Sequence, residues 1–389
     1  MRAAPLPRPL LLLLAASSAA SPPPCLLVGG AQASAFSFDG AGGVPQFLGS
    51  SATACGASPG FLAFSTTTPG IVYSTSQNEL PPPIGDGDNE PGITTARISC
   101  AGGAGGGAAF ANLSHVATDD PCHVAIHPSG KWVFSAAYGA GTIAWMPVKP
   151  DGTLGLARQM AVGDKAHAVN FDATGAFVFV PCLGVNYVAQ LTFDAASGAL
   201  NWNSVAPTAA LPNASGPRHM VFHPALPSLA FVLCELTSVV VPFALNASTG
   251  ALTQVGAPLS TIRAGLPSPT VQAAAEILAS ADGRFLYATN RASPLGRGDN
   301  SIAVIPLSPE GAMTGSVVQW ATGEGVGALS FPRHALLTSA PGQPYFLTVS
   351  QNSGVITVFE RDQTSGLLFQ TAAKNAQNQQ PTFIGELFA

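Results

Sequence analysis

Residues 216–224 read "GPRHMVFHP", and the core of this phrase returns at residues 331–339 as "FPRHALLTS". Related phrases open at Asp120 ("DPCHVAIHP") and at Asp164 ("DKAHAVNFD"). Weaker versions begin at Ser58, Gln272 and Gln379. The phrases follow one another at intervals of roughly fifty residues, and a phrase that returns at a regular period predicts a repeat architecture.

Most phrases continue into a turn, a second apolar run and then a third. After the phrase at Gln272, the second run is "DGRFLYATNR" from Asp282 and the third is "NSIAVIPLSPEGAM" from Asn300. Gly, Asp and Pro stand at the turns, where a positive or fixed φ is needed. Strand–turn–strand units at this spacing predict the blades of a β-propeller, in which small sheets surround a central axis.

The two ends of the chain predict how the ring closes. The phrase around Pro381 runs almost directly into the C-terminus, so its blade lacks outer strands. Residues 25–40 form a strand, a turn and a strand with no phrase before them. We therefore expect an all-β, seven-bladed β-propeller that spans residues 25–389 as a single domain. Its last blade is closed by the N-terminal strands, which leaves no open sheet edge.

The composition excludes some classes of function. Apolar residues make up 47% of the chain and charged residues only 9%, with four lysines in all. Nucleic-acid binding needs clustered lysine and arginine, so we expect no nucleic-acid partner. Apolar stretches stay shorter than the ~18 residues of a membrane-spanning helix, so we expect no membrane span. We expect the protein to be a monomer.

Residues 1–20 differ in composition from the rest of the chain. They contain Arg2 and Arg8, a short apolar run at residues 10–16, and small residues ending near Ala20. This order is typical of a secretory signal peptide. A plastid transit peptide is the alternative, because such peptides are also rich in Arg and Ser and poor in acids. We expect secretion, with a plastid location as the alternative.

The six cysteines would allow disulfides in an oxidising compartment. Cys182 and Cys234 occupy equivalent places in adjacent blades, and we expect both to be free thiols. Packed sheets lie about 10 Å apart, whereas a disulfide needs Cα atoms within about 7 Å. Sequons at Asn112, Asn213 and Asn246 are compatible with glycosylation after secretion.

The third residue of each phrase gives a set of candidate site residues. Symmetry places these seven residues at similar height around one axis: Phe61, His123, His167, His219, Glu276, His334 and Phe383. Most of them are titratable, in a chain with few charged residues. The alternative is that each histidine packs between blades and binds backbone groups of its neighbour. Propeller ligand sites gather side chains from several blades at the mouth of the central channel, which favours a site.

Arginines join this set from two directions. Arg218 and Arg333 precede their histidines, and Arg291 ends a second strand in "ATNRAS". Glu235 stands at the equivalent strand end one blade earlier, so a structural ion pair with Arg291 is the alternative. Guanidinium groups bind carboxylate or phosphate in a bidentate manner. Such a site would fit proton transfer at an anionic substrate, which opening or closing a lactone of a sugar acid or diacid requires.

These phrases, with "AAEILASADGRFLYATNR" and "NSGVITVF", resemble the seven-bladed lactonase family of bacterial 6-phosphogluconolactonases and fungal carboxy-muconate lactonising enzymes. The resemblance covers the chain from Cys25 to the C-terminus. It implies site residues at His167, Arg218, Glu235 and Arg291, and neither a metal nor an organic cofactor. Cys182 stands before Leu-Gly, and Cys234 stands before Glu-Leu. The family has polar residues at both of these positions.

We therefore expect a metal-independent lactone hydrolase that acts on a small anionic lactone or sugar acid. His167 would be the general base or proton shuttle, Arg218 and Arg291 would clamp the anion, and Glu235 would orient them. We assign substrate binding to His123, His219, Glu276, His334 and Arg333. The alternative is a secreted or organellar propeller that binds a small anionic ligand or a protein partner without turnover. A metal-dependent lactonase would need oxygen ligands for calcium, whereas this ring offers histidines.

Overall fold

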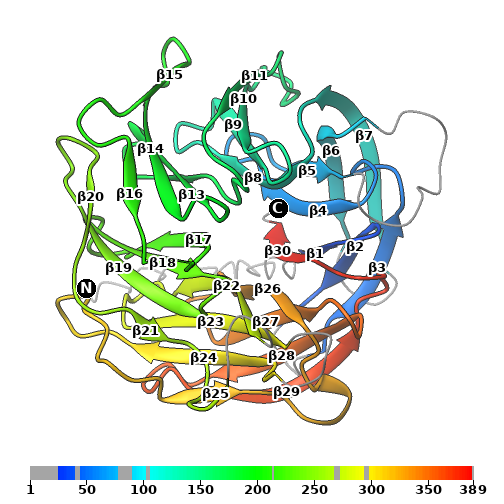
Figure 1. Ribbon diagram of the computed structural model, residues 1–389. Helices are drawn as coiled ribbons and strands as arrows, with labels where there is room; N and C mark the ends of the chain where they lie inside the picture. The colour runs from blue at the N-terminus through cyan, green and yellow to red at the C-terminus, as the bar shows by residue number, and fades with distance from the viewer. Residues whose placement is uncertain are drawn as a thin grey trace, which may run out of the picture.

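The chain forms a ring of seven antiparallel sheets around a central axis (Figure 1). The computed structural model describes residues 25–39, 44–77, 90–101, 106–212, 214–266, 272–292 and 298–387. The predicted targeting segment, residues 1–20, and the sequon at Asn213 lie outside the described residues. Within the described residues, no helix has the length and apolar character needed to cross a membrane.

The blades are numbered here in chain order, and each is given from its inner strand outward. Blade 1 consists of β4 (Pro59–Phe64), β5 (Ile71–Ser76), β6 (Gly92–Cys100) and β7 (Ala108–Ala117). Blade 2 consists of β8 (Pro121–Ile126), β9 (Trp132–Ala137), β10 (Thr142–Pro147) and β11 (Arg158–Ala161). Blade 3 consists of β12 (Asn170–Phe171), β13 (Phe177–Cys182), β14 (Tyr187–Asp194) and β15 (Ala199–Trp202), with β16 (Thr208–Ala210) also paired to β14.

The remaining blades follow the same plan. Blade 4 consists of β17 (Pro217–Phe222), β18 (Leu229–Cys234), β19 (Val239–Leu245) and β20 (Leu252–Gln254), with β21 (Leu259–Ser260) also paired to β19. Blade 5 consists of β22 (Gln272–Ala279), β23 (Phe285–Ala292), β24 (Ser301–Pro306) and β25 (Gln319–Ala321). The 3-10 helix η1 (Gly325–Gly327) leads to blade 6, with β26 (Pro332–Leu337), β27 (Tyr345–Ser350), β28 (Val355–Arg361) and β29 (Leu368–Asn375).

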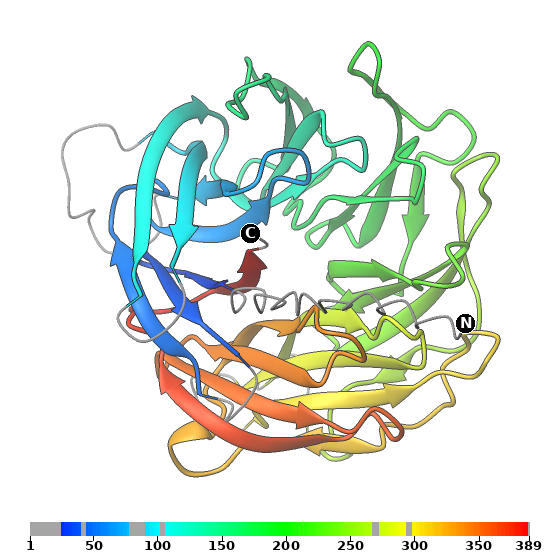
Figure 2. The same ribbon diagram turned by 180° about the vertical axis from the view of Figure 1, so that it is seen from behind.

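The two ends of the chain share blade 7, as the sequence predicts. Its inner strand is the C-terminal β30 (Phe383–Leu387), followed outward by β1 (Cys25–Gly29), β2 (Ala33–Ser37) and β3 (Gln46–Ser51). β1 pairs with β30 antiparallel, from Cys25 opposite Leu387 to Gly29 opposite Phe383. Figures 1 and 2 show this sheet filling the gap between blades 1 and 6. The outermost strand β3 was not predicted.

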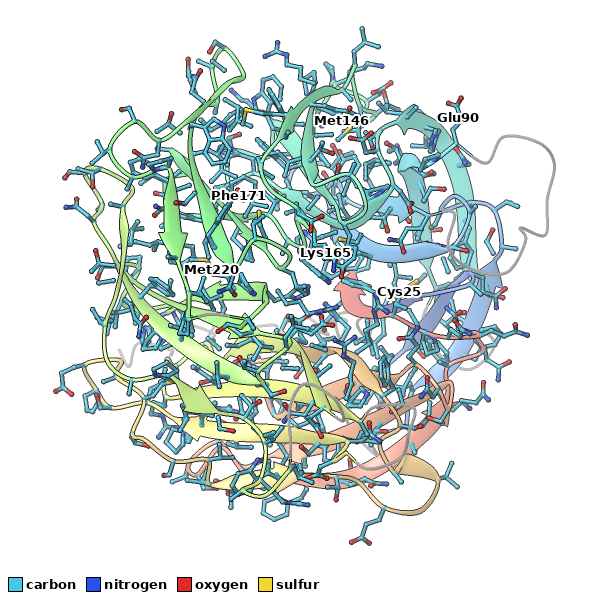
Figure 3. All side chains as sticks on the ribbon, viewed as in Figure 1. Cys25, Glu90, Met146, Lys165, Phe171 and Met220 are labelled. Carbon is cyan, nitrogen blue, oxygen red and sulfur yellow. A yellow bond between two sulfur atoms is a disulfide. The ribbon has the colours of Figure 1, made fainter. Side chains whose placement is uncertain are left out.

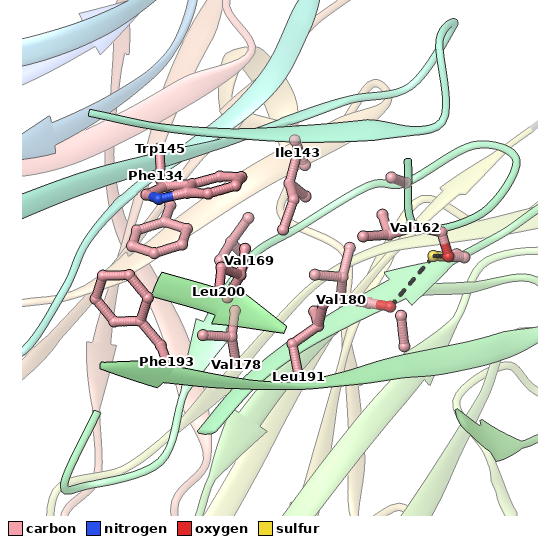
Figure 4. Close-up of a cluster of buried hydrophobic side chains, with 14 of the residues drawn as sticks. Phe134, Ile143, Trp145, Val162, Val169, Val178, Val180, Leu191, Phe193 and Leu200 are labelled. Atoms are coloured by element: carbon pink, nitrogen blue, oxygen red, sulfur yellow. Dashed lines mark hydrogen bonds between the residues drawn. The ribbon is translucent and has the colours of Figure 1, made fainter. Parts of the chain in front are cut away.

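The core lies between neighbouring blades. Figure 4 shows one such layer, in which Phe134 and Trp145 of blade 2 face Phe193 and Val178 of blade 3. A sheet that is covered on both faces needs apolar side chains at successive positions, not only at alternate ones. This explains why β9, "WVFSAA", is buried at every position.

A disulfide joins Cys25 of β1 to Cys100 at the end of β6, with the two Cα atoms 6.1 Å apart. It therefore links blade 7, where the ring closes, to blade 1. Cys182 and Cys234 are free and buried, which confirms the prediction for that pair. The disulfide also shows that two cysteines of neighbouring blades can be bonded. The average spacing of packed sheets therefore does not decide whether a given pair of cysteines forms a disulfide.

We expect loss of this disulfide to lower the free energy of unfolding. The two cysteines are 75 residues apart in the chain, and cross-linking a loop of that length restricts the unfolded chain by about 4 kcal/mol in the chain-entropy model. Urea unfolding of the Cys25→Ala/Cys100→Ala variant measures the loss. As the matched control, dithiothreitol should destabilise the wild type but not this variant. An equal response of both proteins to dithiothreitol would contradict a stabilising disulfide.

Candidate functional site

The repeated Pro-Arg-His phrase forms a β-bulge at the start of each inner strand where it occurs. In blade 4, Pro217 pairs with Cys234 and His219 pairs with Leu233, so Arg218 has no residue opposite it. The same shift occurs in blades 2 and 6. A bulge redirects the side chain of the extra residue. The phrase therefore sends its second and third residues into two different layers along the axis.

The third residues form the first layer, which we call the axial ring. Phe61 lies at its centre, with its ring centroid 4.3 Å from His123, 5.1 Å from His334 and 4.7 Å from Phe383. His219 also contacts Phe61, at 6.1 Å. The side chains of different blades therefore meet on the axis, as the sequence predicts.

Blade 3 departs from the predicted register by one residue. Ala166 forms a bridge with Cys182, and Asn170 pairs with Phe179. These pairs contain the same one-residue shift as the other phrases, with Ala166 at the position of Pro217, so Ala168 occupies the position of the axial-ring histidine. The prediction that His167 belongs to this ring is therefore wrong, because it aligned Lys165 with the proline of the other phrases, whereas Lys165 occupies the position of Gly216 and shares its positive φ.

His167 instead occupies the position that Arg218 has in blade 4. Its ring lies 5.3 Å from that of His219 and 5.6 Å from that of Tyr138. It is buried, and its Nδ1 has no hydrogen-bond partner among the described residues. The offset therefore brings a histidine into the layer of the arginines.

The second layer is a cluster of two arginines and one glutamate, which we call the Arg–Glu–Arg cluster. Oε2 of Glu235 lies 2.9 Å from Nε of Arg218 and 3.0 Å from Nη2 of Arg291. Arg218 also donates to the carbonyl of Ala275 at 2.5 Å, and Arg291 to that of Ala274 at 3.0 Å. The arginine side chains are 4% and 6% exposed, whereas Glu235 is 21% exposed. The carboxylate is therefore the member that reaches solvent.

The charges of this cluster are set by mutual stabilisation. Burial acts to raise the pKa of Glu235, but Arg291 and Arg218 outweigh it and hold the pKa below its ordinary value. Burial lowers the pKa of Arg291 to about 9, partly offset by Glu235. Two guanidinium groups and one carboxylate leave a net positive charge near solvent, which favours an anionic ligand.

Glu276 connects two histidines of the axial ring. Its Oε1 lies 3.0 Å from Nδ1 of His219, and its Oε2 lies 3.1 Å from Nε2 of His334. Nδ1 of His334 accepts the backbone N–H of Ile384 at 3.4 Å, so Nε2 is the nitrogen that carries the proton. Glu276 thus fixes the orientation of both rings beneath the Arg–Glu–Arg cluster.

Burial controls the protonation of these groups. Burial is the largest cause that lowers the pKa of His123, His167 and His219 well below the usual value, and nearby Arg218 adds to it. Burial also lowers the pKa of His334, to about 4, and raises that of Glu276. The histidines are therefore neutral at neutral pH, which is the state in which imidazole accepts a proton.

We expect the protein to lose stability as the pH falls from 7 towards 5. Below about pH 6.5 the unfolded chain protonates histidines that stay neutral in the fold. Each such histidine lowers the free energy of unfolding by about 1.4 kcal/mol per pH unit. His123, His167, His219 and His334 all contribute in this direction. Glu276 acts in the opposite sense, because its raised pKa gives stability that is lost as the pH rises. Four histidines outweigh one carboxyl.

Urea unfolding at several pH values measures this slope. The matched variant is His123→Phe, because Phe61 and Phe383 stand at equivalent positions of the axial ring. The slope should become shallower by the contribution of one proton. An unchanged slope in this variant would contradict the assignment of His123 as a buried neutral histidine.

Two other histidines show the packing role that the sequence left open. Nε2 of His127 bonds the carbonyl of Gly175 at 2.9 Å, and Nε2 of His223 bonds that of Gly283 at 2.9 Å. These contacts tie neighbouring blades together away from the axis. Arg333 donates to Oε1 of Gln351 at 3.2 Å in its own blade. Its charge also acts on the Arg–Glu–Arg cluster, so it lies close to the site.

Sequence reasoning missed two aromatic residues of the site. The Phe331 ring lies 5.0 Å from the guanidinium carbon of Arg291. Tyr138 contacts His167, and Nζ of Lys165 lies 5.7 Å from the Tyr138 ring. Figure 3 shows Lys165 near the axis. The one available signal was that Phe stands before Pro-Arg-His in one phrase and Gly in the other.

These features define a propeller protein with a buried Arg–Glu–Arg cluster of net positive charge near its axis. The chain belongs to the family described as "Lactonase, 7-bladed beta-propeller", which it matches over residues 28–385. No group of three or more His, Cys, Asp or Glu that could hold a metal ion is found among the residues that the structure describes.

Individual relatives agree with this family. The 6-phosphogluconolactonase of Pectobacterium carotovorum subsp. carotovorum is 29% identical over 276 residues, which are 69% of this chain and 74% of the relative. That of Serratia proteamaculans is 27% identical over 268 residues, 69% of this chain and 75% of the relative. The solved structure of the periplasmic gluconolactonase of Pseudomonas aeruginosa is 25% identical, with a TM-score of 0.78, and covers 94% of this chain and 99% of its own. These comparisons confirm the family predicted from the sequence.

Proposed function

We propose that this protein hydrolyses a lactone of a small sugar acid at the Arg–Glu–Arg cluster. The observation that carries the proposal is the neutral His167 in the same layer as two guanidinium groups that share one carboxylate. Lactone hydrolysis needs a base for water and positive charge for the oxyanion, and this layer supplies both. Family membership and the names of the relatives support this reaction.

The proposed reaction runs in two steps. His167 accepts a proton from a water molecule as the water oxygen adds to the lactone carbonyl. The resulting oxyanion is stabilised by the guanidinium groups of Arg218 and Arg291, which Glu235 holds in place. When the tetrahedral species collapses, the ring C–O bond breaks and His167 returns the proton to the leaving oxygen. The net change is lactone plus water to the open hydroxy acid.

We also propose that the protein works outside the cytosol. The disulfide between Cys25 and Cys100 supports this, because disulfides persist in oxidising compartments. The periplasmic location named for the Pseudomonas aeruginosa structure supports it as well. Residues 1–20 would then act as a cleaved signal peptide. Outside the cell, an unphosphorylated sugar-acid lactone is the expected substrate rather than a phosphorylated one.

A second candidate function is the binding of an anion without turnover. Both arginines already bond backbone carbonyls of blade 5, at Ala275 and Ala274, so the cluster also ties two blades together. A protein with this role would bind the open sugar acid and leave lactones unchanged.

A pH-indicator assay tests the proposal on glucono-1,5-lactone, 6-phosphogluconolactone and muconolactone, each with and without a chelator. Lactones open spontaneously, so the baseline is the Glu235→Gln variant, which keeps the side-chain shape and removes the charge that both arginines share. We expect acid release by the wild type above this baseline, unaffected by chelator. Equal rates for the two proteins on every lactone would overturn the proposal, and loss of activity in chelator would indicate a metal.

A further inference from the structure

Phe331 has a backbone conformation that is rare for a bulky residue. Its φ is +64°, in the left-handed region where a side chain is crowded by its own backbone. The equivalent residue of blade 4 is Gly216, with φ +63°. The carbonyl of Gly216 accepts the N–H of Glu235 at 2.7 Å, and that of Phe331 accepts the N–H of Gln351 at 3.0 Å. The turn before Pro-Arg-His therefore requires a positive φ, which glycine adopts without strain and Phe331 does not.

A side chain of the neighbouring blade holds Phe331 in this conformation. Oδ1 of Asn300, next to β24 in blade 5, accepts the backbone N–H of Phe331 at 2.8 Å. The same atom accepts the N–H of Ala292 at 2.9 Å. Ala292 follows Arg291 directly in β23. The amide oxygen of Asn300 thus holds Phe331 in a fixed position relative to the end of β23, which carries Arg291.

The phenyl ring lies over the guanidinium group that this strand end presents. The ring centroid is 5.0 Å from the guanidinium carbon of Arg291, within the range of a cation–π contact. In the plane of the group, Arg291 is held by Glu235 at 3.0 Å and by the carbonyls of Ala274 and Ala273 at 3.0 and 3.3 Å. Ring and acceptors together restrict both the tilt and the rotation of the guanidinium.

We propose that Phe331 is a positioning residue of the site, whose ring fixes Arg291 for the anionic group of the substrate. The proposal rests on the proposed function, since it names how one anion-binding group of that site is held. Ser58, Lys165 and Gln380 have a positive φ at the same turn of other blades, so the strain belongs to the turn, and the ring is what Phe331 adds. Gly216 satisfies the same turn in blade 4 but has no side chain to cover Arg218.

The test compares two substitutions that relieve the same kind of backbone strain. Phe331→Gly removes the ring, whereas Gln380→Gly changes the residue before Pro381, which has φ +52° and belongs to the corresponding phrase of blade 7. We expect neither variant to lower the melting temperature. Only Phe331→Gly should raise KM for an anionic lactone, by about tenfold, with a smaller change in kcat. Phe331→Tyr, which keeps the ring, should stay within about twofold of the wild type. Equal KM values for both glycine variants would overturn the proposal.

A double-mutant cycle with Arg291→Lys tests the coupling without relying on turnover. Urea unfolding of the wild type, Phe331→Leu, Arg291→Lys and the double variant should give non-additive free energies. Additive values would overturn the proposal whether or not a lactone is hydrolysed. If the wild type turns over none of the lactones, the proposed function fails. The role of Phe331 is then tested by the thermal stabilisation of the protein by D-gluconate. Gluconate should raise the melting temperature of the wild type more than that of Phe331→Gly, and an equal rise, or none in the wild type, would count against it.

Discussion

Replacing Arg218 with lysine should lower turnover of a confirmed lactone substrate by about 10²-fold or more, the loss typical of a removed transition-state donor. The planar guanidinium faces Glu235 through Nε and reaches the carbonyl of Ala275 through Nη1. Lysine keeps the charge but cannot make both contacts in one plane. Stopped assays at saturating lactone measure the loss. Because Arg218 is 3% exposed, we also expect a lower melting temperature, so both proteins are compared where they are fully folded.

The matched control is Arg333→Lys, because Arg333 occupies the same bulge position in blade 6. Its guanidinium donates to the neutral amide of Gln351 in its own blade, whereas Arg218 contacts the carboxylate of Glu235 in its own. We therefore expect a milder loss of turnover from this substitution. Equal and small effects of both substitutions would mean that Pro-Arg-His serves blade architecture, and that the assignment of Arg218 to catalysis is wrong.

The ring and its closure could be predicted because they depend on local patterns. Apolar runs and turn residues mark each strand, and the incomplete phrase at Pro381 requires strands from elsewhere. The pairing of Cys25 with Leu387 supplies them. The outer strand β3 was missed, since its pattern QFLGSS is half exposed and lacks a continuous apolar run.

The site was predicted less completely, because it depends on bulges and on contacts between blades. The periodicity predicts that each phrase places its third residue on the axis, and this holds for His219 and His334. The phrase of blade 3 has no proline to mark its first strand residue, so His167 was placed one residue out of register. The contact of Phe331 with Arg291 joins blades 6 and 5 and leaves no periodic signal in the sequence.

A variant that begins at Phe47 should fail to fold into a stable ring. It lacks β1 and β2, so the backbone of β30 loses its partner strand along Phe383–Leu387. It also loses apolar side chains such as Leu26, Val28 and Phe36, which are fully buried against blade 6. Burying each such side chain contributes about 1.5–3 kcal/mol. The sum of these contributions is a large part of the ~5–15 kcal/mol by which a typical domain is stable.

Near-ultraviolet circular dichroism and thermal unfolding measure the result, and we expect loss of the cooperative transition together with aggregation through the exposed edge of β30. The matched control begins at Cys25, keeps every described strand, and should unfold like the full chain. Adding a synthetic peptide of residues 25–40 to the short variant should restore part of the transition, because an added strand can pair with an open sheet edge. An unchanged melting temperature in the variant that begins at Phe47 would show that blades 1 to 6 hold the ring without these strands. The ring would then fold without closure by the N-terminal strands.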